Sequence, residues 1–234
     1  MQISTEMTRF PSNGREMPGY LARPEGEGPF PGLVIIQEWW GLVPHIKDVA
    51  RRFAAEGYMV LAPDLYHGEA AQEPDEARKL AMKLERDRAV TEIVAAGNFL
   101  LNMDLVSGQQ VGLVGWCMGG GLALSTAAES DVPGAVVCFY GRPLDEADTA
   151  NVRAPILGLY GSEDRGIPPA DVREFEAALR ASGIVHEILI YDGAQHAFFN
   201  DTRAAYDAQA AADAWQRTLA WFATYLRGDS GAAE

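Results

Sequence analysis

The residues best suited to chemistry surround Cys117, in the run VGLVGWCMGGG at positions 111–121. Gly115 and Gly119 stand two residues before and after the cysteine, which is the G-x-S-x-G pattern of a nucleophile elbow with cysteine in place of serine. Glycine suits both positions because this strand-to-helix turn is so tight that a Cβ would clash. The free N–H groups of the following helix would favour a thiolate, the reactive form of cysteine. The pattern predicts a nucleophile; the alternative is a glycine-rich turn with a buried structural cysteine.

The elbow lies within an alternation of apolar strands and helices. We expect two short strands at 2–8 and 17–23 around the turn Ser12-Asn13-Gly14, and further strands at 32–36, 58–62, 111–114, 134–139, 155–160 and 187–191. Helices are expected at 44–56, at 75–102 in one or two pieces, after the elbow over 122–128, at 170–181 and at 203–226, with a polar loop at 66–75. Because the strands are almost continuously apolar, the sheet should be mostly parallel and covered by helices on both faces.

Length and charge narrow the class of protein. A chain of 234 residues without a low-complexity linker fits one α/β domain over 1–234. The net charge of −14 argues against nucleic acid and against an anionic membrane surface as partners. No signal peptide or membrane-spanning run is apparent, and the only cysteines are Cys117 and Cys138. We therefore expect a cytoplasmic protein without a disulfide, with Cys138 as a buried apolar residue in a strand.

Candidate partners for Cys117 follow the later strands. The carboxyl ends of parallel strands gather at one edge of the sheet, where α/β proteins place their chemistry. Asp164 stands four residues beyond the strand at 155–160 and His196 five beyond the strand at 187–191. The chain order nucleophile, acid, histidine is that of a hydrolytic triad. Glu163 is the rival acid, and His67 the rival base.

The other two histidines fit a catalytic role less well. His45 is interpreted as a solvent-facing residue of the first helix. His186 comes just before the last strand, which would put it at the opposite edge of the sheet. His196 is therefore the base we expect.

The chain resembles the dienelactone hydrolase family over most of its length. The motifs behind the resemblance are QEWWG at 37–41, APDLYHG at 62–68, GWCMGG at 115–120, YGSEDRGIP at 160–168 and AQHAFFN at 194–200. The resemblance implies a single-domain α/β-hydrolase that opens a lactone with a cysteine nucleophile. Carried over to the matching positions, Cys117 is the nucleophile, Asp164 the orienting acid and His196 the base. Glu38 matches an additional acid near the thiol.

The resemblance also implies where the substrate is held. The backbone N–H groups of Met118 and Trp39 would form the oxyanion hole. The family holds a substrate carboxylate with arginines, one shortly after the histidine; this chain has Asn200 there, and the nearest arginine is Arg203. Candidate substrate-binding residues are the side chains at the predicted site edge and in the helix at 75–102, namely Trp40, Tyr66, Arg78, Tyr140, Phe198 and Arg203, with Arg142 and Arg165 as further cations.

Several neighbours of the site have structural alternatives. Glu38 lies between a buried strand and two tryptophans, so we expect it to be buried, where a carboxylate needs partners or a proton. Trp39 and Trp40 could both be core residues, or one of them could line the pocket wall. Phe198 and Phe199 are residues of a kind that more often packs in the core than contacts substrate. The basic stretch 73–88 is interpreted as a solvated helix face. The alternative is that it supplies the cation that a carboxylated substrate would need.

The sequence predicts a hydrolase of a small ester or lactone that acts through a thioacyl intermediate, with no metal or cofactor. Amides are less suitable substrates, because a thiolate leaves a tetrahedral intermediate more readily than an amine does. Alternatives are a general carboxylesterase for neutral esters, a thiol redox sensor and a silent binding protein. The redox sensor lacks a C-x-x-C motif or a resolving cysteine. We expect a small-molecule substrate as the partner, and a monomer or small homo-oligomer.

Overall fold

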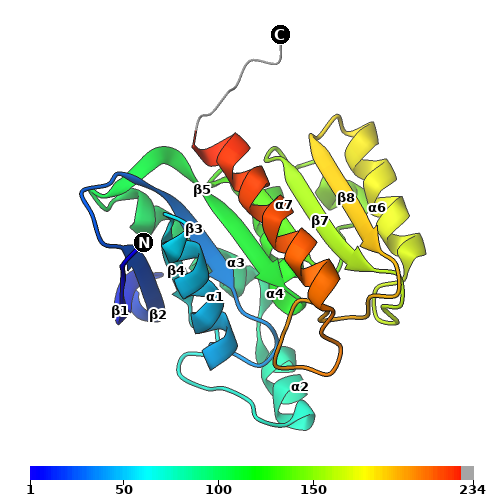
Figure 1. Cartoon of the computed structure of the whole chain (residues 1–234), viewed down its shortest axis with the longest axis horizontal. Helices are drawn as coiled ribbons and strands as arrows, with labels where there is room; N and C mark the ends of the chain where they lie inside the picture. Colours follow the sequence, from blue (N-terminus) through cyan, green and yellow to red (C-terminus); the bar gives the residue numbers. More distant parts are fainter. Residues whose placement is uncertain (228–234) are drawn as a thin grey trace.

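The computed structural model describes residues 1–227 and shows one sheet between two layers of helices (Figure 1). Its eight strands lie in the order β1-β2-β4-β3-β5-β6-β7-β8. The strands span Ile3–Ser12 (β1), Arg15–Pro24 (β2), Phe30–Ile36 (β3), Met59–Pro63 (β4), Val106–Trp116 (β5), Pro133–Phe139 (β6), Ile156–Gly161 (β7) and His186–Tyr191 (β8). From β4 onwards in this order all neighbours are parallel, whereas β1 and β2 form an antiparallel hairpin whose β2 joins β4. The predicted fold class, α/β with a mostly parallel sheet and helices on both faces, is confirmed.

The helices cover both faces of the sheet. They span Pro44–Ala55 (α1), Pro74–Lys83 (α2), Arg86–Leu101 (α3), Met118–Glu129 (α4), Glu146–Thr149 (α5), Pro169–Ala181 (α6) and Ala208–Leu226 (α7). One core cluster lies under α1 and α7, and a second lies under α3, α4 and α6. Burial of both faces explains why the strands are apolar throughout rather than alternating. None of the helices over 1–227 is long and apolar enough to cross a membrane.

Most predicted elements are confirmed, and the differences lie at their ends. The helical stretch 75–102 is two helices, α2 and α3, separated by residues 84–85. The short helix α5 was not predicted. The C-terminal helix was expected from residue 203 but begins at Ala208, because the Asp207 carboxylate caps it by accepting from the N–H groups of Gln209 and Ala210. Its predicted core residues Trp215 and Phe222 are buried.

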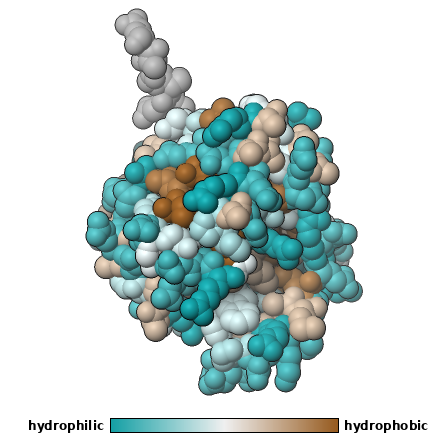
Figure 2. Space-filling view, turned by 90° about the vertical axis from the view of Figure 1, so that its right-hand side faces the viewer, coloured by the Kyte–Doolittle hydropathy of each residue, from teal (hydrophilic) through white to brown (hydrophobic). Residues whose placement is uncertain are grey.

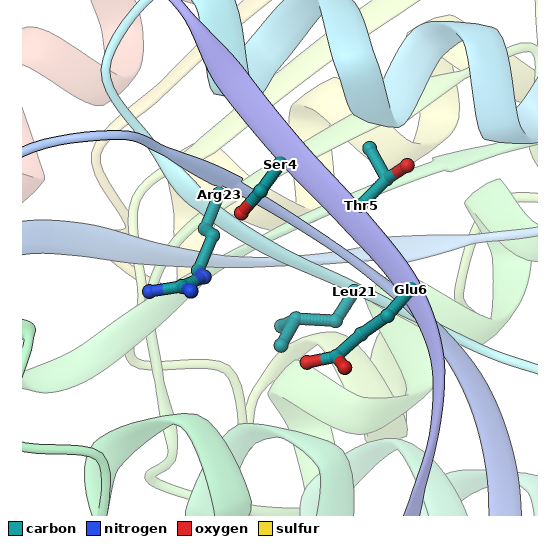
Figure 3. A pocket seen from close by; sticks show the side chains of 5 residues that line it. All are labelled: Ser4, Thr5, Glu6, Leu21 and Arg23. Atoms are coloured by element: carbon teal, nitrogen blue, oxygen red, sulfur yellow. The ribbon is translucent and has the colours of Figure 1, made fainter.

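Two pockets open on the surface, and one of them, of about 210 Å³, is lined by residues of the loop after β4, including Tyr66 and His67, and of α2 and α3. The face in Figure 2 is largely hydrophilic, with small scattered apolar areas. A pocket of about 120 Å³ lies over the β1–β2 hairpin and is lined by Ser4, Thr5, Glu6, Leu21 and Arg23 (Figure 3). It includes none of the residues that the sequence singled out for chemistry, so the site must be sought elsewhere.

Candidate active site

Cys117 lies where β5 turns into α4, as the sequence predicts. Its backbone φ of +56° is in the left-handed region, which is unusual for a residue other than glycine. A Cβ on Gly115 would run into the carbonyl of Gly119, and a Cβ on Gly119 would run into the carbonyls of Ile36 and Gln37. Both glycines are therefore required for the steric reason predicted. The Cys117 N–H donates to the Phe139 carbonyl at 3.0 Å, which fixes the turn against β6.

Other strained residues surround the same edge. His67, Tyr140 and Ala197 have φ values of +55°, +38° and +65°, and they follow β4, β6 and β8. Such conformations persist only where the surrounding structure holds them, and they concentrate at functional sites. The only other example outside glycine in residues 1–227 is Asn13, in the β1–β2 turn.

Asp164 and His196 form the pair expected of an acid and a base. His196 Nδ1 lies 2.6 Å from Asp164 Oδ2. The other carboxylate oxygen, Oδ1, accepts from the N–H groups of Gly166 and Ile167 at 2.8 and 3.0 Å. Asp164 is 3% exposed, whereas its rival Glu163 is exposed. Asp164, and not Glu163, is therefore the carboxylate that faces His196, and its role as the acid stays a prediction.

The imidazole of His196 interacts with the sulfur as well as with Asp164. Burial alone would lower the pKa of His196, but hydrogen bonds to Asp164 and to Cys117, together with their charges, raise it to about 10. Tyr140 packs edge-on against the imidazole, with 5.0 Å between ring centroids. A histidine with this pKa is an imidazolium at neutral pH, which can stabilise a thiolate and later donate a proton.

Glu38 is a second buried carboxylate at the site, confirming the predicted burial at 2% exposure. Its Oε2 accepts from Asn200 Nδ2 at 2.6 Å, and its Oε1 accepts from the Tyr140 hydroxyl at 3.4 Å. Desolvation raises the pKa of Glu38, against the opposing effects of Asn200, Arg203 and His196. Among residues 1–227, its hydrogen bonds go to these two neutral groups and not to Cys117.

Two backbone N–H groups are available for an oxyanion. Met118 is the first residue of α4, where an N–H has no partner inside the helix. Trp39 follows Glu38 in the loop after β3, and within residues 1–227 neither N–H donates to another part of the chain. Both residues contact the Tyr66 hydroxyl: it donates to the Trp39 carbonyl at 3.1 Å and lies 3.5 Å from the Met118 sulfur.

The arginines predicted to bind substrate differ in their surroundings: Arg203 is held against Trp40, whereas the others are exposed. Arg203 stacks on Trp40, with its guanidinium carbon 3.7 Å from the ring centroid, and Nε is buried without a partner among residues 1–227. Arg78 is different: its side chain is 66% exposed and lies 3.8 Å from Asp75. Arg142 and Arg165 are exposed.

Three expectations about individual residues are wrong. Phe198 is completely buried and packs on Tyr140 and Tyr191, so it is a core residue and not a substrate contact. Tyr140 is also completely buried, and its hydroxyl serves Glu38 rather than facing an open site. His45 is 7% exposed instead of solvent-facing. The start of α1 packs against the loop after His196, and the His45 Nδ1 lies 3.4 Å from the Asp201 carboxylate in that loop.

The contacts of His67 and His186 are with groups other than Cys117 and Asp164. His67 Nε2 lies 3.1 Å from the Glu92 carboxylate on α3. His186 begins β8 at the opposite edge of the sheet, and its Nδ1 bonds to the Ile184 carbonyl at 2.7 Å. Within residues 1–227, no three His, Cys, Asp or Glu side chains are grouped closely enough to hold a metal ion.

The model of the dienelactone hydrolase family matches residues 17–226. The chain belongs to this family. Its members hydrolyse lactones and esters, and the chain is a lactone or ester hydrolase of this kind. Similar dienelactone hydrolases have the α/β-hydrolase fold, which confirms the fold class predicted for this chain.

Individual relatives match the chain over nearly its whole length. "Protein usf" of Aquifex pyrophilus is 35% identical over 94% of this chain and 99% of its own. A protein of Escherichia coli (strain K12) named "Putative carboxymethylenebutenolidase" is 36% identical over 95% of this chain and 88% of its own. Among solved structures, a "Putative Dienelactone Hydrolase" from Klebsiella pneumoniae superposes with a TM-score of 0.89 at 34% identity, covering 96% of this chain and 100% of its own.

Proposed function

We propose that the chain hydrolyses a small ester or lactone through a thioacyl intermediate on Cys117, with His196 and Asp164 completing a triad. The observation that carries this proposal is the chain of contacts at the elbow. Asp164 holds His196 at 2.6 Å, and hydrogen bonding to Asp164 and Cys117 keeps the pKa of His196 near 10. An imidazolium near a sulfur favours the thiolate that must attack the acyl carbon.

In the first half of the reaction the Cys117 thiolate attacks the carbonyl carbon. A C–S bond forms, and the carbonyl electron pair moves to the oxygen, to which the N–H groups of Trp39 and Met118 would donate hydrogen bonds. Such donors are worth about 3–4 kcal/mol each in comparable sites. The oxyanion then collapses, the C–O bond to the leaving group breaks, and the His196 imidazolium gives its proton to the departing alkoxide. In a lactone that alkoxide stays attached to the acyl group.

In the second half the neutral His196 takes a proton from water as the water oxygen attacks the thioester carbon. Collapse of the second tetrahedral intermediate breaks the C–S bond and releases a carboxylic acid. The thiolate and the imidazolium of the resting enzyme are restored. Asp164 fixes the orientation of the imidazole through both halves.

Glu38 would tune the thiol rather than take part in bond making. Its carboxylate is buried, and its two hydrogen-bond partners are neutral. Desolvation raises the pKa of Glu38, and the hydrogen bond from Asn200 opposes that effect. A negative charge beside a thiolate disfavours that thiolate. We therefore assign Glu38 to control of Cys117 ionisation, acting across the site and not through a direct hydrogen bond.

The substrate is an ester or lactone, and three observations bear on whether it carries a carboxylate. Arg203 is held on Trp40 with Nε unpartnered among residues 1–227, which suits an anionic group at the site. Asn200 stands where the family has arginine, and its amide donates a hydrogen bond to Glu38. The net charge of −14 also repels anions at long range. The hydrogen bond from Asn200 and the net charge favour the alternative, a general carboxylesterase for neutral esters.

A thiol redox sensor has less support. Cys138 is completely buried beside the Tyr160 hydroxyl, and burial raises its pKa to about 11, so it is poorly suited to resolve an oxidised Cys117. Two free thiols suit a reducing cytoplasm, which is where we place the enzyme.

A panel of p-nitrophenyl esters and lactones, assayed before and after alkylation with iodoacetamide, tests the proposal. We expect turnover of neutral or carboxylated members and complete loss after alkylation of Cys117. Cys138→Ala is the matched control and should keep both turnover and its sensitivity to iodoacetamide. Activity that survives full modification of Cys117 would reject the mechanism. Absence of turnover over the whole panel would favour a silent binding protein.

A further inference from the structure

The loop after β3 carries the Trp39 N–H, and its backbone is held at three consecutive carbonyls. The Glu38 carbonyl accepts from the Gly41 N–H at 3.2 Å, which closes a turn in which Gly41 has a φ of +94°. The Trp40 carbonyl accepts from the Ala71 N–H at 3.0 Å. Between them, the Trp39 carbonyl accepts from the Tyr66 hydroxyl at 3.1 Å. Tyr66 is thus the single side chain among the three donors.

The same hydroxyl reaches the other side of the expected oxyanion hole. It lies 3.5 Å from the sulfur of Met118, the first residue of α4. Burial, reinforced by the charge of the nearby Cys117, raises the pKa of Tyr66, so its hydroxyl keeps its proton and remains a donor. Tyr66 therefore bridges the two residues whose N–H groups would stabilise the oxyanion.

The turn that carries Tyr66 is itself tightly held. The buried Asp64 carboxylate accepts from the N–H groups of Tyr66 and Gly68 at 3.2 and 2.7 Å. The side-chain oxygen of Gln37 accepts from the Leu65 N–H at 3.2 Å, which joins this turn directly to the end of β3. His67, in a left-handed conformation, lies 3.1 Å from the buried carboxylate of Glu92 on α3.

We propose that Tyr66 is a positioning residue for the oxyanion hole: its hydroxyl sets the distance between the Trp39 loop and the start of α4. This inference rests on the proposed function and replaces the substrate-binding role predicted for Tyr66, because the hydroxyl is already engaged by the protein. Hydrogen-bond donors to a developing charge are effective only when held in place before the reaction, and small displacements weaken them. Loss of the hydroxyl should therefore slow chemistry without changing the thiolate.

The Tyr66→Phe variant tests this role by separating two reactions of the same sulfur. Hydrolysis of p-nitrophenyl acetate requires an oxyanion, whereas displacement of iodide from iodoacetamide requires only the thiolate. We expect kcat to fall about 10- to 100-fold with KM changed less than about threefold. The rate of alkylation and its pH profile should stay within about twofold of wild type. Affinity for a simple aliphatic aldehyde, whose thiol adduct places an oxygen in the oxyanion hole, should fall in parallel with kcat.

Controls distinguish this inference from failure of the proposed function. Tyr225→Phe, at a tyrosine 37% exposed on α7, should leave all three measurements unchanged. His67→Gln loosens the turn from outside the site and should lower kcat in the same direction by a smaller factor. A wild-type kcat in Tyr66→Phe would overturn the positioning role. So would an alkylation rate that falls as much as kcat does, because Tyr66 would then act on the thiolate itself. Turnover that survives in Cys117→Ala would instead reject the proposed function itself.

Discussion

The site contains two buried carboxylates whose surroundings differ. Asp164 accepts from two backbone N–H groups and faces an imidazole at 2.6 Å, so its negative charge is matched by hydrogen bonds and by a cation. Glu38 accepts from an amide and a phenol, and Arg203 acts on it only at longer range. Burial raises the pKa of Glu38 because neutral partners offset little of the lost hydration.

The difference suggests separate tasks for the two groups. A carboxylate hydrogen-bonded to an imidazole can hold one tautomer of histidine and stabilise the imidazolium. A carboxylate whose pKa is raised by burial can instead adjust the reactivity of its neighbours. On this account the Asp164 side of the site performs proton transfer, and the Glu38 side determines when the thiolate is present and which substrate is accepted.

The largest effects should come from the Asp164 side. Asp164→Asn and His196→Ala should each lower kcat by roughly 10³–10⁴-fold, and the double variant should be little worse than the poorer single variant, since the triad acts as a unit. Steady-state kinetics with p-nitrophenyl acetate measure this. Glu163→Gln, at the exposed neighbour, is the matched control and should be close to wild type. Full additivity of the two single losses would show that the residues act independently.

The pH dependence on this side has a defined sign. Asp164 raises the pKa of His196, so the imidazolium persists up to a pH of about 10. Acylation that needs this proton should decline as the pH rises through that value. In Asp164→Asn the decline should begin at a lower pH, because the variant loses a group that raises the pKa. A profile whose alkaline limb stays in place would remove Asp164 from control of the imidazolium.

A smaller effect is expected on the Glu38 side from Arg203, which stacks on Trp40. If the substrate carries a carboxylate, Arg203→Ala should raise its KM by about 10- to 100-fold, the equivalent of one charged hydrogen bond. Neutral esters should change little. Arg78→Ala is the control, because that side chain is exposed and lies beside Asp75. A neutral ester hydrolysed far better than its carboxylated analogue, at low and at high salt, would establish the carboxylesterase alternative.

Glu38→Gln should give the smallest change in activity, a few-fold at neutral pH. Removing a negative charge near the sulfur favours the thiolate, so the pH profile of Cys117 alkylation should move to lower pH. Alkylation rates with iodoacetamide between pH 5 and 9 measure the shift. An unmoved profile would mean that Glu38 has no influence on the thiol.

The same variant gives a stability measurement that does not depend on activity. Because the folded pKa of Glu38 is raised above its ordinary value, its contribution to stability is largest at acidic pH and is lost as the pH rises from about 4.5 upward. Glu38→Gln remains neutral, so its Tm should decline less than that of wild type between pH 5 and pH 8. A parallel decline of both proteins would contradict the raised pKa.

The sequence predicts the fold and the Asp164 side of the site from local patterns. Gly115 and Gly119 restrict the elbow by simple sterics, and apolar strands with polar residues at their carboxyl ends place Asp164 and His196 near Cys117. These features depend on chain order and strand direction, which a sequence carries directly. The buried position of Glu38 was predictable for the same reason, since it follows a core strand.

What the sequence did not reveal are contacts between distant segments that leave no periodic signal. Asn200 on Glu38 and the Tyr66 hydroxyl on the Trp39 carbonyl join residues 162 and 27 positions apart. The burial of His45 follows from how the loop after His196 folds over α1, and the late start of α7 follows from the cap at Asp207. The Asp207 cap was the one local signal that could have been recognised in advance.

The central claim, that Cys117 forms a thioacyl intermediate, is tested most directly by trapping that intermediate. Wild-type protein is mixed with p-nitrophenyl acetate, denatured in acid during the first turnover and digested for mass spectrometry. We predict an acetyl group on the peptide that contains Cys117, in step with one equivalent of p-nitrophenol released per site, and none on the corresponding peptide of Cys117→Ala. Release of p-nitrophenol with the acetyl group on another residue, or equal release by Cys117→Ala, would contradict the account.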